Sequence, residues 1–239
     1  MLRPKNNKTK PRIKHRPFLK WAGGKFRLTD DLNRVFPKRK QCLIEPFVGA
    51  GAVFLNSHFE RYILADINPD LINLFNIVKE NVDAYIEACK PIFFAENANT
   101  ADYYYAQRDT FNQSSDPFER SVLFLYLNRF GFNGLCRYNS KNEFNVPFGA
   151  YKTHYFPEDE LRYFAHKAQS AVFLCADFQQ TFELADKHSV IYCDPPYAPL
   201  PQDTNFTGYA GNAFGIEHQK NLAECAKKAQ KEKQISVVI

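Results

Sequence analysis

In the first and last thirds of the chain, short apolar runs alternate with longer amphipathic stretches. Short apolar runs predict buried strands. These runs occupy residues 42–47, 61–66, 171–177, 189–194 and 234–239. Amphipathic stretches between them predict helices at 49–59, 68–90 and 215–233, the second with Asn68 as its N-cap and Pro69 in its first turn. Strands that alternate with helices are typical of a parallel sheet with crossover connections.

The middle of the chain, residues 92–165, lacks this alternation. A helix is predicted at 117–130, because Asp116 stands at its N-cap and Glu119 completes a capping-box pattern. Two short extended runs around a polar turn then predict a β-hairpin within 135–148. A parallel sheet whose strand–helix pattern is interrupted by a stretch without that pattern indicates an inserted, mainly helical domain.

The pattern divides the chain into three parts. We expect a basic flexible arm at 1–16, a discontinuous Rossmann-like α/β domain formed by 17–70 and 165–239, and the inserted domain at 71–164. The net charge is +5, and residues 1–20 hold basic but no acidic side chains. Such an arm is usually solvated, yet it also attracts a polyanion such as nucleic acid.

Composition excludes several classes of protein. No apolar stretch approaches the length of a membrane span, and the N-terminus has no signal-like apolar segment. We therefore expect a cytoplasmic protein with no membrane partner. The six cysteines show no C-x-x-C spacing, which predicts reduced thiols and neither a metal site nor a disulfide framework.

The most specific chemical signal is the run Asp194-Pro195-Pro196-Tyr197 at the end of a predicted strand. Prolines lack the N–H of a sheet ladder, so the pair must lie beyond the strand. The aspartate carboxylate and the carbonyl of Pro195 are placed to accept both hydrogens of an exocyclic amine, and the tyrosine to stack on its base. Adenine N6 fits such a pocket once the nucleotide is flipped out of the duplex.

Gly49 and Gly51 separate a predicted strand from a helix, where a nucleotide-like ligand can approach bare backbone. The turn is not a full G-x-G-x-x-G, because position 54 is Phe, and a purely structural turn is an equal interpretation. Asp66, at the tip of the next strand, is placed to hold a ribose diol, with helix capping as the alternative.

Trp21 and Lys25 bracket a Gly-Gly pair that by itself indicates only a turn. An aromatic face and an ammonium group suit a ligand that carries both a cation and a carboxylate. S-adenosylmethionine carries both, so these residues favour it as the cofactor.

Cationic and aromatic side chains interleave between 129 and 155, where only Glu143 is acidic. The aromatic core of a small helical domain explains part of this pattern. Arg137, in the first arm of the predicted hairpin, also suits bidentate recognition of a guanine edge in the major groove. Phe132 is placed to wedge into a base stack, so DNA is the expected partner.

The sequence resembles the Dam-type DNA adenine-N6 methyltransferases, which form the α group and D12 class of such enzymes. The likeness runs from about Pro17 to Ile239, in the order cofactor motif, recognition domain, catalytic motif. It rests on "FLKWAGGK", "EPFVGAGAVFLN", "RYILADIN", "LYLNRFGFNGLCRYN", "EFNVPFGAYK" and "VIYCDPPYAPL". The resemblance implies methyl transfer from S-adenosylmethionine to adenine N6 in GATC of double-stranded DNA.

The resemblance also implies roles for the residues that match the motifs. Cofactor contacts fall on Trp21, Lys25, Glu45, Phe47, Gly49, Gly51, Asp66 and Asp194. The target-amine pocket falls on Asp194, Pro195, Pro196 and Tyr197. For DNA, Phe132 intercalates, Asn133 holds the backbone, and bases are read by Leu135, Arg137 and Pro147. The family often has Tyr where Phe132 stands, and we expect little change from the loss of a hydroxyl.

The cellular roles of the family and the length of its members lead to further expectations. The resemblance implies a monomer associated with the nucleoid, with roles in marking strands for mismatch repair, in replication timing and in gene regulation. Family members continue past the strand at 234–239, so we expect this chain to lack the family's C-terminal end. The alternative function is a truncated DNA-binding form with weak or no catalysis.

Other functions of the same motifs are less well supported. Related sites methylate RNA bases or protein glutamine, but those enzymes usually place the motif much closer to the glycine turn than Asp194 lies to Gly51. A dehydrogenase would explain the glycine turn and neither Asp194-Pro195-Pro196-Tyr197 nor the hairpin.

Overall fold

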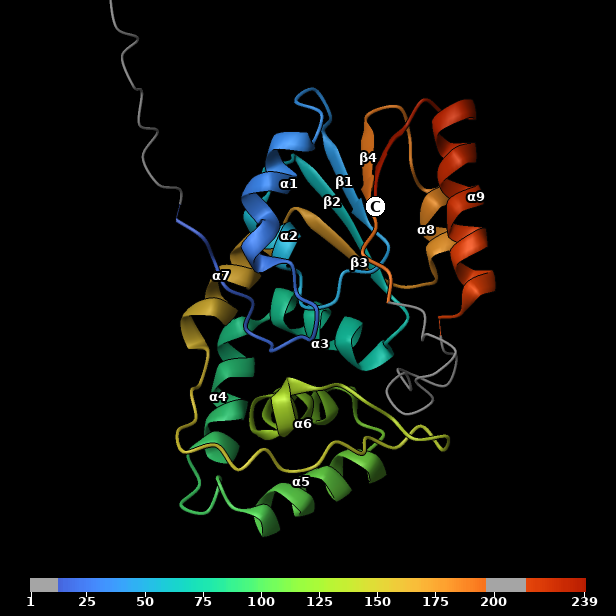
Figure 1. Ribbon diagram of the computed structural model, residues 1–239. Coiled ribbons are helices and arrows are strands. Elements are labelled where there is room, and N and C mark those ends of the chain that lie inside the picture. Colours follow the sequence, from blue (N-terminus) through green and yellow to red (C-terminus); the bar gives the residue numbers. More distant parts are fainter. Residues whose placement is uncertain (1–12, 197–213) are drawn as a thin grey trace, which may run out of the picture.

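The computed structural model describes residues 13–196 and 214–239. A parallel sheet with the strand order β3-β2-β1-β4-β5 forms the upper half of the molecule (Figure 1). Its strands are β1 (Cys42–Glu45), β2 (Arg61–Asp66), β3 (Ala171–Cys175), β4 (Ser189–Tyr192) and β5 (Ser236–Val238). Each lies within a predicted apolar run, and the mixed α/β architecture confirms the predicted Rossmann-like fold class.

Helices cover both faces of this sheet (Figure 1). One face packs against α1 (Thr29–Val35), which follows the 3-10 turn η1 (Phe26–Leu28), and against α2 (Ala52–Asn56), α3 (Pro69–Glu80) and α7 (Glu158–Ala168). The other face packs against α8 (Phe178–Glu183) and α9 (Ile216–Glu232). Neighbouring strand residues alternate between the two cores: Leu43 and Val190 belong to the first, and Ile44 and Ile191 to the second.

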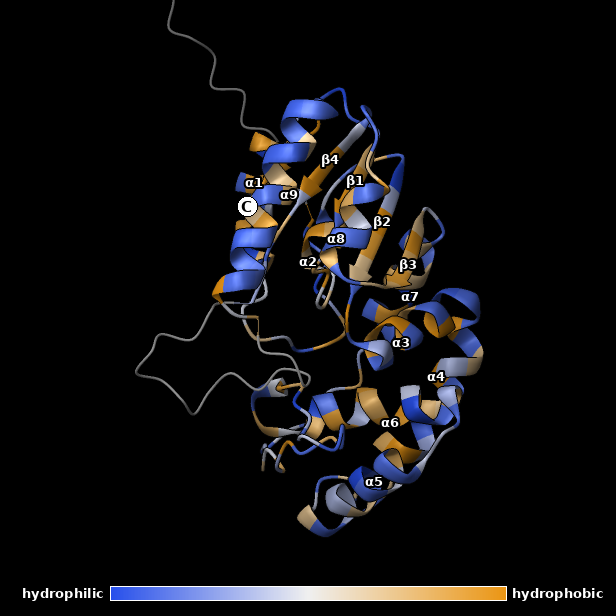
Figure 2. Cartoon of the chain, turned by 90° about the vertical axis from the view of Figure 1, so that its right-hand side faces the viewer, coloured by the Kyte–Doolittle hydropathy of each residue, from blue (hydrophilic) through white to orange (hydrophobic). Residues whose placement is uncertain are grey.

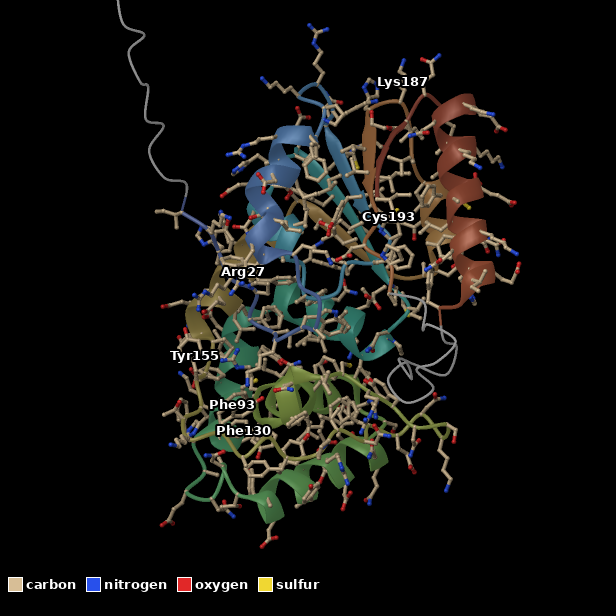
Figure 3. The ribbon with its side chains drawn as sticks, viewed as in Figure 1. Arg27, Phe93, Phe130, Tyr155, Lys187 and Cys193 are labelled. Atoms are coloured by element: carbon tan, nitrogen blue, oxygen red, sulfur yellow. The ribbon has the colours of Figure 1, made fainter. Side chains whose placement is uncertain are left out.

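A helical layer lies at the carboxyl edge of the sheet and contains most of the inserted segment (Figure 1). It consists of α4 (Val82–Phe93), α5 (Ala101–Gln113), α6 (Pro117–Phe130) and a short 3-10 turn, η2 (Phe132–Gly134). Aromatic rings fill its core; for example, the centroids of Phe93 and Phe130 lie 5.5 Å apart (Figure 3). Part of the aromatic enrichment near residue 130 is therefore core packing.

The structure differs from the sequence prediction in three elements. The long helix predicted at 68–90 is two helices, because Asn81 interrupts it and caps α4 by accepting the backbone N–H of Ala84. The helix predicted at 49–59 is only α2. The predicted hairpin does double back, but its arms form no strands: they are paired by the isolated antiparallel bridge of Tyr138 with Phe144 and by two backbone bonds, of Asn145 to Arg137 and of Asn139 to Glu143. A second isolated bridge joins Gly131, which precedes the predicted hairpin, to Phe148.

The division of the chain into a cofactor domain and a recognition domain stays a prediction. The helix α3 contacts β2 and β3 of the sheet and also α6 of the helical layer, so it belongs to both packing units. The outer surface of α9 is hydrophilic (Figure 2). Within 13–196 and 214–239, no helix has the length and apolarity that crossing a membrane would require.

The N-terminus of α6 has the predicted cap. Asp116 Oδ1 accepts the backbone N–H of Glu119 at 2.7 Å, and Pro117 occupies the first helical position. The carboxylate of Glu119 bonds instead to the hydroxyl of Ser114, so the predicted capping box is only half formed. The cap satisfies one of the N–H groups that every helix start leaves without an intrahelical partner.

Replacing Asp116 by Ala is expected to lower the free energy of unfolding by about 1 kcal/mol, the usual cost of losing an N-cap. Urea denaturation followed by circular dichroism measures this difference. The neighbouring Ser115→Ala is the control, since Ser115 is exposed. Equal stability of the Asp116→Ala and Ser115→Ala proteins would contradict the prediction.

Candidate functional site

A cavity of about 800 Å³ lies at the carboxyl edge of the sheet, and the helical layer contributes to its wall. In open parallel sheets, ligands bind where the strand order reverses. Here the order reverses between β1 and β4. The predicted site residues that line the cavity are Trp21, Lys25, Glu45, Phe47, Gly49, Asp66, Asp194, Pro195 and Pro196. The structure therefore gathers most of the predicted cofactor and catalytic residues around one space.

Asp194 follows β4 closely and forms an ion pair with Lys25. Lys25 Nζ donates to Asp194 Oδ2 at 2.7 Å and to the carbonyl oxygen of Gly23 at 2.8 Å. The two side chains of the pair are only 20% and 28% exposed, which strengthens the interaction relative to a surface pair. Two motifs that are distant in the sequence thus meet in a single charged contact.

The glycine turn after β1 is tied to the end of β2 by Asp66. Asp66 Oδ2 accepts the backbone N–H of Gly49 at 3.2 Å, and its Oδ1 accepts the N–H of Asn68 at 3.0 Å. Asn68, and not Asp66, caps α3. Gly49 has φ +48°, and a Cβ there would lie 2.7 Å from the indole nitrogen of Trp21, so only glycine lets the indole pack on the turn. Gly51, at φ +74°, is not part of the described cavity wall.

Glu45, the last residue of β1, is a buried carboxyl group in the cavity wall. Its side chain is 2% exposed, and within the described residues its Oε1 has no hydrogen-bond partner. Burial raises the pKa of Glu45 to about 8, and the nearby charge of Asp194 adds to the rise. At neutral pH the group is therefore mostly protonated, and it presents a polar atom that no described residue satisfies.

The raised pKa of Glu45 predicts a pH-dependent stability. Between the ordinary glutamate value and about 8, the folded protein binds a proton that the unfolded chain has released. The free energy of unfolding should therefore fall as the pH rises through this window, by at most ~1.4 kcal/mol per pH unit. In the Glu45→Gln protein, which cannot titrate there, the fall between about pH 6 and about pH 8 should be smaller.

Urea denaturation of the ligand-free proteins at several pH values measures both slopes. Parallel pH profiles for the original protein and the Glu45→Gln variant would contradict the assigned pKa of Glu45.

Two aromatic rings and a further strand-end carboxylate of the cavity wall were missed from the sequence. The rings of Phe47 and Phe178 stack with centroids 5.7 Å apart, and Phe214 meets Phe47 edge-on at 5.6 Å. Asp177, just beyond β3, also lines the cavity. Its position after an apolar run is the same signal that singled out Asp66, so it could have been found.

Four further residues of the cavity wall were also missed from the sequence. Lys20, Arg129, Cys136 and Tyr138 all line the cavity. Lys20 Nζ donates to the carbonyl oxygen of Arg129 at 2.8 Å and lies 3.8 Å from the centroid of the Tyr151 ring. Burial, and then the charge of Arg129, lowers the pKa of Lys20 to about 8. These contacts join segments far apart in the sequence, and no local pattern reveals them.

The predicted DNA-binding residues lie on the helical layer, outside the described cavity wall. Phe132 is 48% exposed, and its N–H donates to the carbonyl oxygen of Pro147 at 2.9 Å. Asn133 has a left-handed φ of 54°. Arg137 is exposed and Leu135 is half-buried. The five residues thus cluster on the two arms of the folded-back segment and the turn before it.

The segment 132–147, which contains these five residues and is called the recognition segment after its predicted role, adjoins the cavity at two points. Cys136 and Tyr138, on either side of Arg137, belong to the cavity wall. Gly134 packs directly on Lys20, since a Cβ at Gly134 would lie 2.1 Å from that of the lysine. Tyr197, assigned to the target-amine pocket, lies outside the described residues.

Comparison with known proteins agrees with this arrangement. The sequence model of the D12 class N6 adenine-specific DNA methyltransferases matches residues 21–239. A DNA adenine methylase of Haemophilus influenzae is 81% identical over 239 residues, which are all of this chain and 84% of that protein. The DNA adenine methylase of Vibrio cholerae is 58% identical over 226 residues, 95% of this chain and 81% of that protein. That of Escherichia coli K12 is 59% identical over 214 residues, 90% of this chain and 76% of that protein.

Proposed function

The chain belongs to the D12 class of N6 adenine-specific DNA methyltransferases, and on that premise we propose that it methylates adenine N6 in GATC sites of duplex DNA with S-adenosylmethionine as the donor. The observation that carries the proposal is the ion pair of Lys25 with Asp194 in a cavity whose wall includes Cys136 and Tyr138. This arrangement supports the proposal, because the groups proposed for chemistry and the segment proposed to read DNA border the same cavity.

The residues of the cavity suit the proposed cofactor. The turn at Gly49 leaves room for a ligand to approach backbone, and Asp66, which already accepts two N–H groups, has lone pairs left for ribose hydroxyls. The rings of Phe47 and Phe178 form an apolar wall suited to a purine. The unpartnered Oε1 of Glu45 supports a polar ligand in the same cavity.

S-adenosylmethionine, when bound, supplies an electrophilic methyl group on its sulfonium. The protein's task is to make adenine N6 a better nucleophile, since its lone pair is delocalised into the ring. Lys25 holds Asp194 by Oδ2, so that the other carboxylate oxygen can accept one N6 hydrogen. The carbonyl of Pro195 accepts the second hydrogen, which turns the nitrogen lone pair toward the donor. Tyr197 is assigned to stack on the base.

The proposed DNA contacts follow the layout of the recognition segment. Phe132 would fill the space left in the stack when the adenine is flipped out, with Asn133 on the backbone. Arg137 would read a guanine edge, and its guanidinium is already ordered, because its Nε donates to Asn145 Oδ1 at 2.7 Å and its Nη2 to the carbonyl oxygen of Asn145 at 3.1 Å. Leu135 and Pro147 complete the base contacts.

We further propose the cellular setting that the family relationship implies. The enzyme acts as a monomer in the cytoplasm, associated with the nucleoid, where GATC methylation marks parental strands for mismatch repair and adjusts replication timing and gene expression. The basic N-terminal segment and the net charge of +5 favour association with DNA.

The proposed reaction is tested by incubating the protein with methyl-labelled S-adenosylmethionine and duplex DNA, then digesting the DNA to nucleosides. The label is expected in N6-methyldeoxyadenosine. Label in a methylated cytosine, or labelled protein with unlabelled DNA, would contradict the proposed reaction. Because Trp21 is the single tryptophan and lines the cavity, its fluorescence should change when S-adenosylmethionine is added without DNA.

A further inference from the structure

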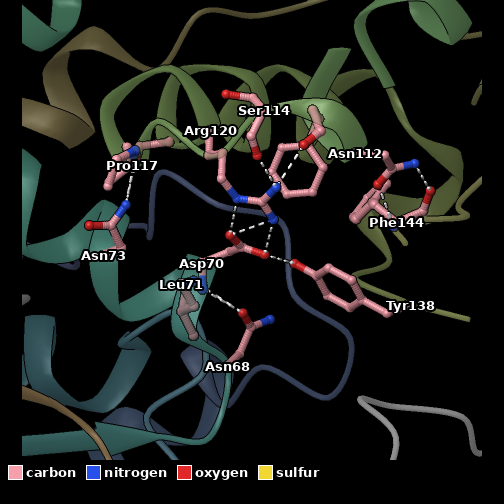
Figure 4. Close-up of polar contacts among 12 residues, drawn as sticks. Asn68, Asp70, Leu71, Asn73, Asn112, Ser114, Pro117, Arg120, Tyr138 and Phe144 are labelled. Atoms are coloured by element: carbon pink, nitrogen blue, oxygen red, sulfur yellow. Dashed lines mark hydrogen bonds and ion pairs between the residues drawn. The ribbon is translucent and has the colours of Figure 1, made fainter. Parts of the chain in front are cut away.

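The first arm of the recognition segment is anchored to the N-terminus of α3 by two side-chain bonds, of which Figure 4 shows that of Tyr138 to Asp70. Asn68 Nδ2 donates to the Sγ of Cys136 at 3.3 Å. The hydroxyl of Tyr138 donates to Asp70 Oδ2 at 2.7 Å. Arg137 stands between the two anchored residues, and its side chain is exposed whereas Cys136 is buried. The alternation of an extended chain therefore directs the anchors inward and Arg137 outward.

The carboxylate of Asp70 is itself held in place by an ion pair with Arg120, which is largely shielded from solvent. Arg120 Nε donates to Asp70 Oδ1 at 2.9 Å and its Nη2 to Oδ2 at 3.0 Å, a bidentate pair whose side chains are 22% and 11% exposed. The remaining nitrogen of Arg120 donates to the carbonyl oxygens of Phe111 and Ser114 at 2.7 and 3.0 Å (Figure 4). The guanidinium thus joins α3, α5 and α6 around the carboxylate that receives Tyr138.

The second arm of the segment is anchored separately. Asn112, on α5, accepts the N–H of Phe144 with its Oδ1 at 2.7 Å and donates its Nδ2 to the carbonyl oxygen of the same residue at 3.1 Å. Between the arms there are isolated bridges and two backbone bonds, from the N–H of Asn145 to the carbonyl oxygen of Arg137 at 3.0 Å and from the N–H of Asn139 to that of Glu143 at 2.9 Å, but no regular ladder of strands. The backbone bond links Arg137 to the second arm, and the side-chain anchors then fix how this paired segment sits on α3 and α5.

We propose that Tyr138, held by Asp70, is a positioning residue for Arg137 and determines how strongly the enzyme discriminates the base pair that Arg137 reads. The inference rests on the proposed function, in which Arg137 contacts a guanine edge. A bidentate contact requires both nitrogens of the guanidinium to be placed within roughly 0.5 Å. A small shift of the arm is therefore enough to lose the discrimination while Asp194 and Lys25 stay in place.

Tyr138→Phe is the variant that isolates this anchor. It removes the hydroxyl but keeps the ring, which packs edge-on against Phe144 with centroids 5.7 Å apart. The bidentate ion pair of Arg120 with Asp70 also remains, so the carboxylate keeps its positively charged partner. Tyr163→Phe is the matched control, since Tyr163 is equally half-buried and its hydroxyl donates to a backbone carbonyl, that of Leu55, at 3.2 Å.

The experiment measures kcat/KM for methyl transfer to a GATC duplex and to two duplexes in which the first or the fourth base pair of the site is changed. For Tyr138→Phe, the preference for GATC over one of the altered duplexes should fall by roughly 5- to 10-fold, part of what a bidentate contact supplies. The preference over the other altered duplex should stay the same. Tyr163→Phe should keep both preferences of the original protein.

A Tyr138→Phe protein that keeps both preferences, or loses rate equally on all three duplexes, would overturn the inference. If thermal unfolding shows that this variant is not folded at the assay temperature, Asp70→Asn takes its place under the same criterion. A failure of the proposed function looks different, because the original protein would then transfer no methyl group to the GATC duplex at all, and the inference would fall with it.

Discussion

Replacing Asp194 by Ala is expected to lower kcat for methyl transfer by roughly 10²- to 10³-fold or more, the range seen when one preorganised group that stabilises a transition state is removed. The carboxylate is the only charged group of the Asp194-Pro195-Pro196-Tyr197 motif, and Lys25 fixes it at 2.7 Å. Without it, one N6 hydrogen has no charged acceptor, and the ammonium of Lys25 loses its partner. Single-turnover transfer of labelled methyl groups measures the change.

Asp186→Ala is the control for this substitution, because Asp186 precedes β4 whereas Asp194 follows it. Its carboxylate pairs with Arg61 at 2.7 Å and accepts the hydroxyl of Ser189 at 2.8 Å and the N–H of His188 at 2.9 Å, and neither Asp186 nor these partners belong to the described cavity wall. We expect the transfer rate of this variant to stay within about twofold of the original. Similar losses in Asp186→Ala and Asp194→Ala would contradict the role given to Asp194.

Arg137→Ala is expected to remove about 1–3 kcal/mol of discrimination at one base pair of the site, the value of a good bidentate contact. The side chain is exposed and its guanidinium contacts only Asn145 among the residues described, so truncation should leave the fold intact. The loss should appear as a smaller ratio of kcat/KM between GATC and the duplex altered at that pair.

The control for Arg137→Ala is Lys141→Ala, which removes the same charge from the exposed turn of the same segment. A lysine that contacts phosphate weakens binding to all sequences alike and reduces its salt dependence. The Lys141→Ala protein should therefore keep its sequence preference. If both variants lower the preference equally, Arg137 acts through charge alone and does not read a base.

The strands, and the aspartates at their carboxyl ends, could be predicted from the sequence because both signals are local. A buried parallel strand is a short apolar run, and Asp66 ends one such strand while Asp194 lies two residues beyond another. The caps Asn68 and Asp116 were also found, since capping depends on residues only two or three positions apart.

The contacts that complete the site could not be predicted, because they depend on packing between distant segments. Arg120 meets Asp70 across the interface of α3 with α6, and nothing near either residue indicates a partner. The break between α3 and α4 at Asn81 was also missed. The helical spacing of apolar residues continues across it, and only Asn81 as an N-cap marks the start of the second helix. The predicted hairpin has isolated bridges in place of strands, because only a few backbone bonds join its arms and side chains from α3 and α5 anchor each arm separately.

The most direct test of the central claim compares two duplexes that differ only at the acceptor. One contains a single GATC site, and in the other the target adenine on each strand is replaced by purine, which lacks the exocyclic amine. Transfer of a labelled methyl group from S-adenosylmethionine to the first duplex alone is the predicted result. Equal transfer to both duplexes, or binding of the first duplex without transfer, would contradict the assignment of this protein as a GATC-specific adenine-N6 methyltransferase.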